Sequence, residues 1–212
     1  MPPTLGQSCY GLRTVTAVDV LVLPDAAAWR RWLDEHETSS DGVWLRLAKK
    51  GTTASTSLTY AQALDEALCS GWIDGQKRAF DEATFVERFT PRRPRSLWSQ
   101  RNIGLVAALT EQGRMRPTGQ AEVDRARADG RWERAYAGSA AIEVPDDLAA
   151  ACAASPVLAA AFAGLDRGNR YAVLHRLATA TTPAVRADRL ARLVAMLERG
   201  DVPHPPRPAA DA

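Results

Sequence analysis

The stretch GWIDGQKRAFDEATFVERF, residues 71–89, decides how the middle of this chain folds. Two runs rich in strand-forming side chains, residues 72–80 and 84–89, flank the polar pair Asp81-Glu82. Apolar and aromatic runs on either side of a short polar turn are typical of a β-hairpin. We therefore expect two antiparallel strands whose side chains alternate between two opposite faces.

The residues before the hairpin predict further strands and two helices. Residues 15–23 (VTAVDVLVL) and 42–49 (GVWLRLAK) have the β-branched or alternating pattern of strands. A helix is expected after Pro24, and Thr59 is expected to cap a second helix over residues 60–70. Together with the hairpin, these elements predict a small antiparallel sheet packed with helices.

The sequence after the hairpin has a helical pattern. Ser96 is expected to cap a helix that runs to about Gln112, and residues 118–129 predict a short polar helix. Four more helical segments follow without a strand, at residues 145–154, 156–163, 167–178 and 183–199. The predicted class is α+β with a C-terminal all-helical unit. We expect an α+β domain over residues 15–138, a helical module over 145–200 and a disordered tail over 201–212.

The composition indicates a globular protein without a strong bias toward polyanions or membranes. A net charge of +2 over 212 residues is too small to indicate a polyanionic partner by itself. No window approaches the roughly 18 consecutive apolar residues of a membrane span, and the N-terminus lacks the pattern of a signal peptide. Cys9, Cys69 and Cys152 are far apart and match no metal motif, so we expect a cytoplasmic protein without disulfides or a metal site.

An arginine-rich segment directly after the hairpin is the best candidate for a site. Residues 88–101 contain five arginines and no acidic residue. The prolines of this segment favour an extended backbone, and a helix N-terminus follows, where backbone N–H groups favour an anion. Arginine binds carboxylate and phosphate groups in bidentate fashion, so Arg92 and Arg93 are expected to hold an anionic ligand.

Aromatic and acidic residues accompany these arginines. Trp72 and Trp98 are candidates for stacking on a flat ligand, although an indole ring serves equally well in a core. Asp74 is a candidate general acid or base, or a residue that ties a turn. Glu66, on the helix before the hairpin, is a second candidate catalytic carboxylate. Its structural alternative is an ion pair with an arginine from residues 88–95.

Strand alternation predicts which of these side chains share a face. Trp72, Asp74 and Gln76 are two residues apart and are expected on one surface. Lys77 then lies on the other face unless a bulge intervenes. The other candidate ligand-binding residues are Lys49, Lys77, Arg88 and Ser99. Lys49 precedes Lys50 and a glycine, where it can contact a phosphate or be solvated.

The same segments resemble a known family. VWLRLAKKG (43–51), LTYAQALDEALCSGWIDGQK (58–77) and RFTPRRPRSLWS (88–99) resemble the YdeI/OmpD-associated family, also described as bacteriocin-protection proteins. The C-terminal helices resemble the short helical module at the end of such proteins. The resemblance covers roughly residues 19–200 and implies a cytoplasmic bacterial protein. It brings no established reaction and no catalytic residue.

These observations favour a pocket for a small anionic or aromatic molecule, which the protein binds, sequesters or modifies in a tolerance or secondary-metabolite role. No cofactor motif is visible, so turnover would be cofactor-independent hydrolysis or rearrangement with Asp74 as acid or base. Two alternatives remain open. One is a structural or partner-docking role in which the arginines pair with carboxylates. The other is single-stranded nucleic-acid binding, which the near-neutral charge disfavours. The sequence leaves the ligand and the oligomeric state undecided.

Overall fold

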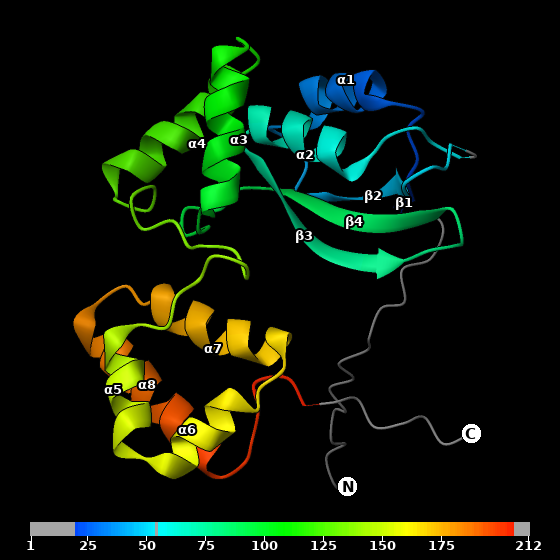
Figure 1. The fold of residues 1–212 in the computed structure, drawn as a ribbon. Helices are drawn as coiled ribbons and strands as arrows, with labels where there is room; N and C mark the ends of the chain where they lie inside the picture. Colours follow the sequence, from blue (N-terminus) through cyan, green and yellow to red (C-terminus); the bar gives the residue numbers. More distant parts are fainter. Residues whose placement is uncertain (1–19, 54, 206–212) are drawn as a thin grey trace, which may run out of the picture. The chain divides into compact units, whose positions relative to one another are not determined.

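The computed structural model of the protein describes residues 20–53 and 55–205 (Figure 1). Of these, the residues up to Arg93 together with Arg114–Ala121 form one compact unit, here called unit 1. Pro94–Gly113 together with the residues from Glu122 onward form unit 2. The domain ranges expected from the sequence, 15–138 and 145–200, remain predictions. Cys9, residues 15–19 and the tail beyond residue 205 lie outside the described residues.

Unit 1 contains a four-stranded sheet with the order β1-β2-β4-β3. β1 (Val20–Leu21) pairs in parallel with β2 (Val43–Ala48), whereas β4 (Thr84–Pro91) lies antiparallel to β2 and to β3 (Trp72–Ala79). The α+β class and the hairpin are confirmed. The sheet is mixed rather than purely antiparallel, because the chain crosses over through a helix between β1 and β2.

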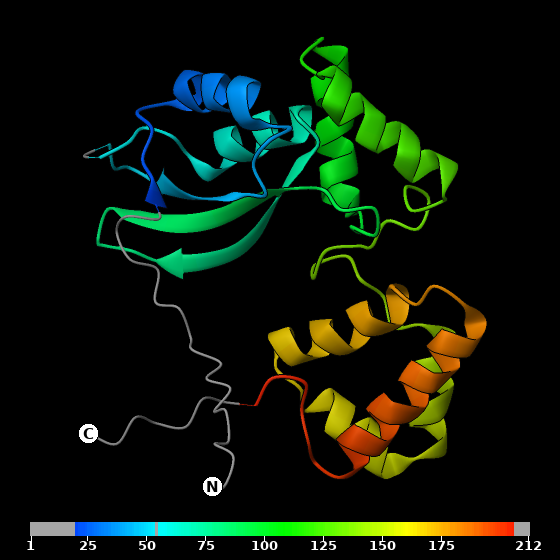
Figure 2. The ribbon, with the colours of Figure 1, turned by 180° about the vertical axis from the view of Figure 1, so that it is seen from behind.

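Two helices, α1 (Ala26–His36) and α2 (Tyr60–Cys69), cover the same face of this sheet (Figures 1 and 2). As predicted, Thr59 caps α2, and a reciprocal hydrogen bond joins it to Gln62 in a capping box. Gly71 follows α2 with φ +73°, a left-handed conformation that lets the chain turn directly from the helix into β3.

The core of unit 1 is aromatic and aliphatic. Trp29 of α1, Trp72 of β3 and Phe89 of β4 are fully buried, and the rings of Trp29 and Trp72 meet edge-on with centroids 6.3 Å apart. Leu45 and Leu47 of β2 are also fully buried, but burial does not alternate strictly along this strand, because Trp44 and Ala48 are buried as well. Burial of each such side chain stabilises the fold by about 1.5–3 kcal/mol.

Unit 2 is helical in its described residues. It contains α3 (Gln100–Glu111), the end of α4 (Pro117–Ala128), α5 (Asp146–Ala154), α6 (Pro156–Ala163), α7 (Arg167–Ala178) and α8 (Pro183–Glu198). The last four confirm the helical segments predicted after residue 145, and their buried leucines, valine and phenylalanine form one cluster. Among the described residues, no helix combines the length and apolar character that crossing a bilayer requires.

The start of α3 differs from the prediction. Ser99 is the N-cap, since its Oγ accepts a hydrogen bond from the backbone N–H of Asn102 at 3.1 Å. The carbonyl of Ser96, the predicted cap, accepts from Nη1 of Arg131 at 2.9 Å. α3 therefore begins three residues later than expected, and Pro94 and Arg95 form a turn before it.

Candidate functional site

A bulge in β3 decides which predicted site residues share a face. Asp74 pairs with Phe89 and Lys77 pairs with Glu87, so a step of three residues on β3 matches a step of two on β4. The extra residue shifts the alternation and moves Lys77 to the same face as Asp74. This is the face that α1 and α2 cover, because Phe89 belongs to the core beneath them. The bulge that the sequence left as a possibility is thus present, and Gln76 lies within it.

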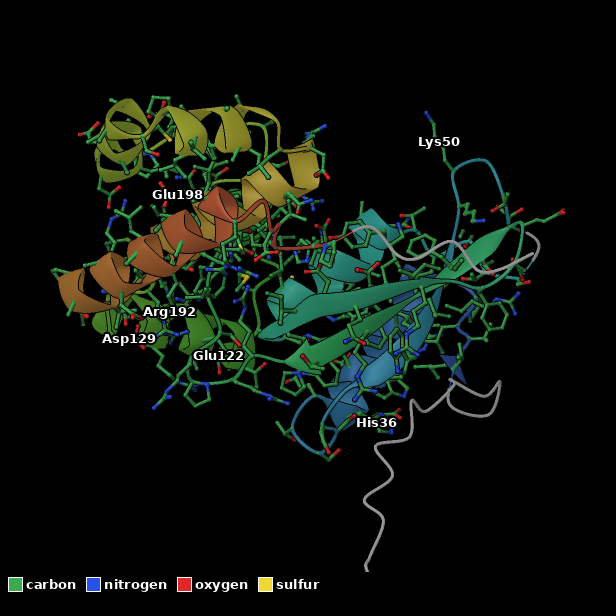
Figure 3. The ribbon with its side chains drawn as sticks, turned by 90° about the horizontal axis from the view of Figure 1, so that it is seen from below. His36, Lys50, Glu122, Asp129, Arg192 and Glu198 are labelled. Carbon is green, nitrogen blue, oxygen red and sulfur yellow. The ribbon has the colours of Figure 1, made fainter. Side chains whose placement is uncertain are left out.

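A pocket of about 690 Å³ opens at the N-terminal end of α2. The end of β2, the first turn of α2 and the hairpin all contribute to its lining, which includes Lys49, Lys50, Tyr60, Lys77, Ala79 and Phe85. We call it the lysine pocket. Lys50 extends from the turn after β2 (Figure 3). The Nζ atom of Lys77 lies 3.9 Å from the centroid of the Phe85 ring, a cation–π contact.

The three lysines of this pocket are the only lysines in the chain, which otherwise uses arginine for its basic residues. Lysine offers a compact ammonium on a flexible stem rather than a planar fork. Nζ of Lys49 donates to the carbonyl of Asp81 at 2.8 Å. Our sequence reasoning gave Lys49 and Lys77 only as separate candidates. The scarcity of lysine, which is visible in the sequence, is the signal that could have joined them.

A hydrogen bond connects this pocket to the predicted acid or base. The hydroxyl of Tyr60, the first residue of α2, donates to Oδ2 of Asp74 at 2.7 Å. Asp74 lies half-buried inside β3, away from the hairpin turn, so turn-tying is not its role. The candidate carboxylate therefore reaches the lysine pocket through one tyrosine that the sequence reasoning did not single out.

Glu87 is a second carboxyl on the same face, and it is not among the site residues predicted from the sequence. It is 5% exposed, and its Oε2 has no hydrogen-bond partner among the described residues. Burial raises the pKa of Glu87 above its ordinary value, the charge of Asp74 raises it further, and Lys77 acts in the opposite direction. A carboxylic acid that favours its protonated form, close to a second carboxylate, is suited to proton transfer.

The two tryptophans of the predicted site are core residues in this structure. Trp72 is fully buried and its indole N–H donates to the carbonyl of Glu37 at 3.1 Å. Trp98 is 2% exposed in unit 2, where its ring packs against Trp132 with centroids 4.9 Å apart. Because neither ring offers a surface to a ligand, the structure supports the core alternative for both. Ser99 is likewise engaged as the cap of α3.

The predicted arginines do not line the lysine pocket. Arg88 pairs in register with Trp44, and both lie on the sheet face opposite to α1 and α2. Arg92 is buried at the end of the hairpin, where its backbone N–H donates to the carbonyl of Gly71 at 3.0 Å, and Arg93 is exposed. The ligand-binding roles of these three arginines remain predictions.

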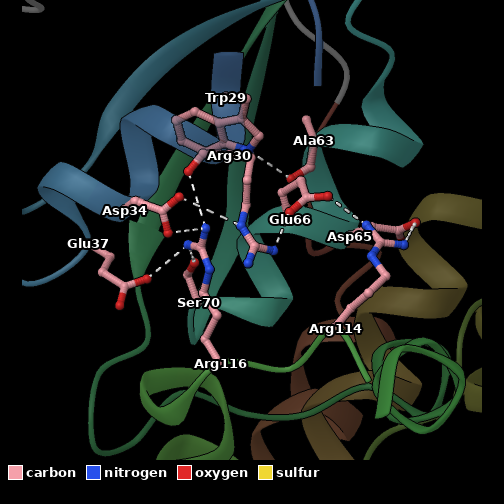
Figure 4. A network of polar contacts seen from close by, with 10 residues as sticks. All are labelled: Trp29, Arg30, Asp34, Glu37, Ala63, Asp65, Glu66, Ser70, Arg114 and Arg116. Carbon is pink, nitrogen blue, oxygen red and sulfur yellow. Dashed lines mark hydrogen bonds and ion pairs between the residues drawn. The ribbon is translucent and has the colours of Figure 1, made fainter. Parts of the chain in front are cut away.

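Glu66 belongs to a network of ion pairs between α1, α2 and the residues after α3 (Figure 4). Its two carboxylate oxygens accept hydrogen bonds from Nη1 of Arg30 at 3.1 Å and from Nη2 of Arg114 at 2.6 Å. Both oxygens are thus occupied, which supports the structural alternative over the predicted catalytic role. The partners are Arg30 and Arg114, whereas the sequence suggested an arginine from residues 88–95.

The segment 114–121 completes unit 1. Nη1 of the buried Arg116 donates to Oε2 of Glu37 at 3.1 Å (Figure 4). A Cβ atom added to Gly119 would lie 2.1 Å from the carbonyl oxygen of Cys69, at the end of α2. The backbone N–H of Arg116 donates to the same carbonyl at 3.1 Å. Charged and backbone contacts therefore fasten this segment to α1 and α2. Within residues 20–53 and 55–205, no three acidic, histidine or cysteine side chains are grouped as metal ligands.

Two family models match parts of the chain. Residues 21–122 match a domain of unknown function (DUF8412), and residues 141–200 match the model described as "Bacteriocin-protection, YdeI or OmpD-Associated". No curated protein and no solved structure matches the chain significantly. The resemblance noted in the sequence is confirmed over residues 141–200. The motifs at residues 43–99, which also suggested it, fall within the match to the domain of unknown function.

Proposed function

We propose that unit 1 binds a small anionic molecule with a flat apolar body in the lysine pocket. This pocket lies within the domain of unknown function that precedes the YdeI/OmpD-associated domain of residues 141–200. The observation that carries this proposal is the convergence of every lysine in the chain on one pocket. Ammonium groups attract a carboxylate or phosphate, and Ala79 and Phe85 contact an apolar body.

The first turn of α2 adds to the preference for an anion. Thr59, Tyr60 and Ala61 line the pocket at the helix N-terminus, where backbone N–H groups and the helix dipole favour negative charge. Lys49 is held by the carbonyl of Asp81 and retains N–H groups for a ligand. An anionic group is therefore favoured both by the N-terminus of α2 and by the lysine ammonium groups.

The size of the pocket favours a small molecule over a polymer. A volume of about 690 Å³ lies within the range of roughly 300–1,000 Å³ that is usual for small-molecule sites. The nucleic-acid alternative depended on stacking of bases on Trp72 and Trp98, and both rings are buried. As part of the proposal, we place the protein in the cytoplasm, where free thiols such as those of Cys69 and Cys152 persist, in a tolerance or secondary-metabolite role.

A second candidate function is turnover of the bound molecule by proton transfer. The hydrogen bond between Tyr60 and Asp74 favours it. The tyrosine oxygen would take a proton from the ligand while its own proton passes to the Asp74 carboxylate. Glu87, in its protonated form, would be the acid that returns a proton to the product. Such chemistry is a cofactor-independent hydrolysis or rearrangement.

Amine acylation of the intact protein, read by peptide mass spectrometry, tests the binding function. Only three lysines are present, so an amine-reactive reagent reports on this pocket and on the N-terminal amine. Among benzoate, salicylate and phenyl phosphate, we expect at least one to slow the labelling of Lys77 and to leave the N-terminal amine unchanged. Absence of protection by all three, together with an unchanged melting temperature, would argue against the proposal.

Matched variants separate the pocket from general charge. Lys77→Met should weaken protection of Lys49, whereas Arg31→Met, at an exposed position of α1, should not. For the catalytic candidate, Asp74→Asn should abolish turnover of a bound compound and preserve its binding. Unchanged turnover in Asp74→Asn would remove Asp74 from the chemistry while leaving the binding function intact.

A further inference from the structure

Unit 2 has a pocket of its own, which does not depend on the function proposed for unit 1. Its volume is about 450 Å³. The segment before α3 contributes Arg95 and Leu97, the loop after α4 contributes Arg131 and Arg134, and Thr179 lies at the end of α7. We call it the arginine pocket. It includes the part of the arginine-rich segment that belongs to unit 2.

A buried guanidinium in this pocket has an unused hydrogen-bond donor. Arg131 is 7% exposed, and its Nε donates to both carboxylate oxygens of Asp129, at 2.9 and 2.8 Å. Its Nη1 donates to the carbonyl of Ser96 at 2.9 Å. Its Nη2 has no partner among the described residues. A charged donor left unsatisfied in a buried position is unfavourable, and an anion that reached it would remove that cost.

The charges around the pocket favour an anion. The lining contains three arginines and one carboxylate, Asp129, which already binds Arg131. A further arginine, Arg189 of α8, donates to Oγ1 of Thr179 at 3.3 Å. Burial, and then the charge of Arg189, lowers the pKa of His175 one turn earlier on α7. The surplus of positive charge therefore extends beyond the lining itself.

We propose that the arginine pocket binds the phosphate or carboxylate group of a small molecule with an apolar part. Arg95 and Arg134 are exposed and would bind the anionic group through guanidinium N–H groups, although Nη2 of Arg134 already donates to the carbonyl of Asp129 at 3.2 Å. Leu97 is 38% exposed, unusual for a large apolar side chain in this structure, and it would contact the apolar part of the ligand. Arg131 acts beneath them as a fixed positive charge.

Calorimetric titration of the full chain with inorganic phosphate and with phenyl phosphate tests this site. Arg95→Ala and Arg134→Ala should each weaken the binding of phenyl phosphate at least about tenfold, the loss of roughly one charged hydrogen bond. Binding of phenyl phosphate should be tighter than that of inorganic phosphate if Leu97 contributes. Both arginines are exposed, so the variants should keep the wild-type circular dichroism spectrum.

Two control variants distinguish binding in the arginine pocket from a general effect of charge and from binding in the lysine pocket. Arg192→Ala removes an arginine of α8 whose side chain is 79% exposed (Figure 3), and it should leave binding unchanged. Because phenyl phosphate can also enter the lysine pocket, the titrations are repeated in the Lys77→Met background, where the loss caused by Arg95→Ala should persist. The proposal is overturned if neither probe binds the wild type at about 10 mM, which corresponds to a negligible affinity. The proposal is also overturned if Arg192→Ala weakens the binding of phenyl phosphate as much as Arg95→Ala does, or if only Lys77→Met weakens it.

Discussion

Replacing Gly119 by alanine should detach the segment 114–121 from α2. The new Cβ would lie 2.1 Å from the carbonyl oxygen and 2.7 Å from the carbonyl carbon of Cys69, well inside the 3.0 Å that real Cβ atoms respect. Both obstructing atoms are backbone, so no side-chain rotation can relieve the overlap. The start of α4 must therefore shift by about an ångström, which breaks the hydrogen bond from the N–H of Arg116 to the same carbonyl.

The expected cost is a balance of three contributions. Overpacking costs about 1–3 kcal/mol. The lost backbone hydrogen bond costs about 0.5–1.5 kcal/mol. Alanine is favoured over glycine within a helix by about 1 kcal/mol, which offsets part of this loss. We expect Gly119→Ala to lower the free energy of unfolding of unit 1 by about 2 kcal/mol.

Urea denaturation followed by tryptophan fluorescence measures this change, because unit 1 contains Trp29, Trp32, Trp44 and Trp72. Gly104→Ala is the matched control. Gly104 also lies in a helix, α3, which belongs to unit 2, and an added Cβ meets nothing within 4 Å, so this variant should leave the unfolding of unit 1 unchanged. If Gly119→Ala were as stable as Gly104→Ala, the close approach of α4 to α2 would be refuted.

Three further perturbations have defined outcomes. Because the pKa of Glu87 is raised in the fold, its ionisation opposes folding, and stability should fall as pH rises above the ordinary glutamate pKa of about 4.3. In Glu87→Gln the urea midpoint should depend less on pH than in the wild type, and the same pH dependence in both proteins would contradict this. Hydrogen bonds from Arg186 lower the pKa of Asp147, so Asp147→Asn should lower the free energy of unfolding by about 1 kcal/mol at neutral pH. This difference in stability between variant and wild type should vanish as acid protonates Asp147, and a difference that does not change with pH would count against the ion pair. Glu66→Gln should destabilise unit 1 by about 2 kcal/mol, and a double-mutant cycle with Arg114→Met that shows no coupling would exclude the pair.

Most of the fold could be predicted because it follows from local patterns. The cap at Thr59, the spacing of Leu45 and Leu47, and the prolines that begin α6 and α8 each act within a few residues of sequence. The start of α3 could not be predicted in this way. Ser96 and Ser99 are both acceptable caps, and Ser99 is selected by a distant contact, since the N–H of Gln100 donates to the carbonyl of Tyr136 at 2.9 Å.

The candidate site could be predicted only in part. Alternation alone put Lys77 on the wrong face, because a bulge is set by the pairing of β3 with β4 and not by β3 itself. Glu66 was recognised as a partner of arginine, but Arg30 and Arg114 are 36 and 48 residues away in the sequence. Such pairings depend on tertiary packing. The lysine pocket was not predicted, although the presence of only three lysines in the sequence could have indicated it.

The interleaving of the two units limits how this protein can be divided. The chain passes from one unit to the other after Arg93, again after Gly113 and again after Ala121. A fragment that ends at Arg93 lacks the residues that fasten α1 to α2, and a fragment that begins at residue 122 lacks Trp98, the partner of Trp132. A cut after Arg93 or after Gly113 therefore separates residues that belong to one compact unit.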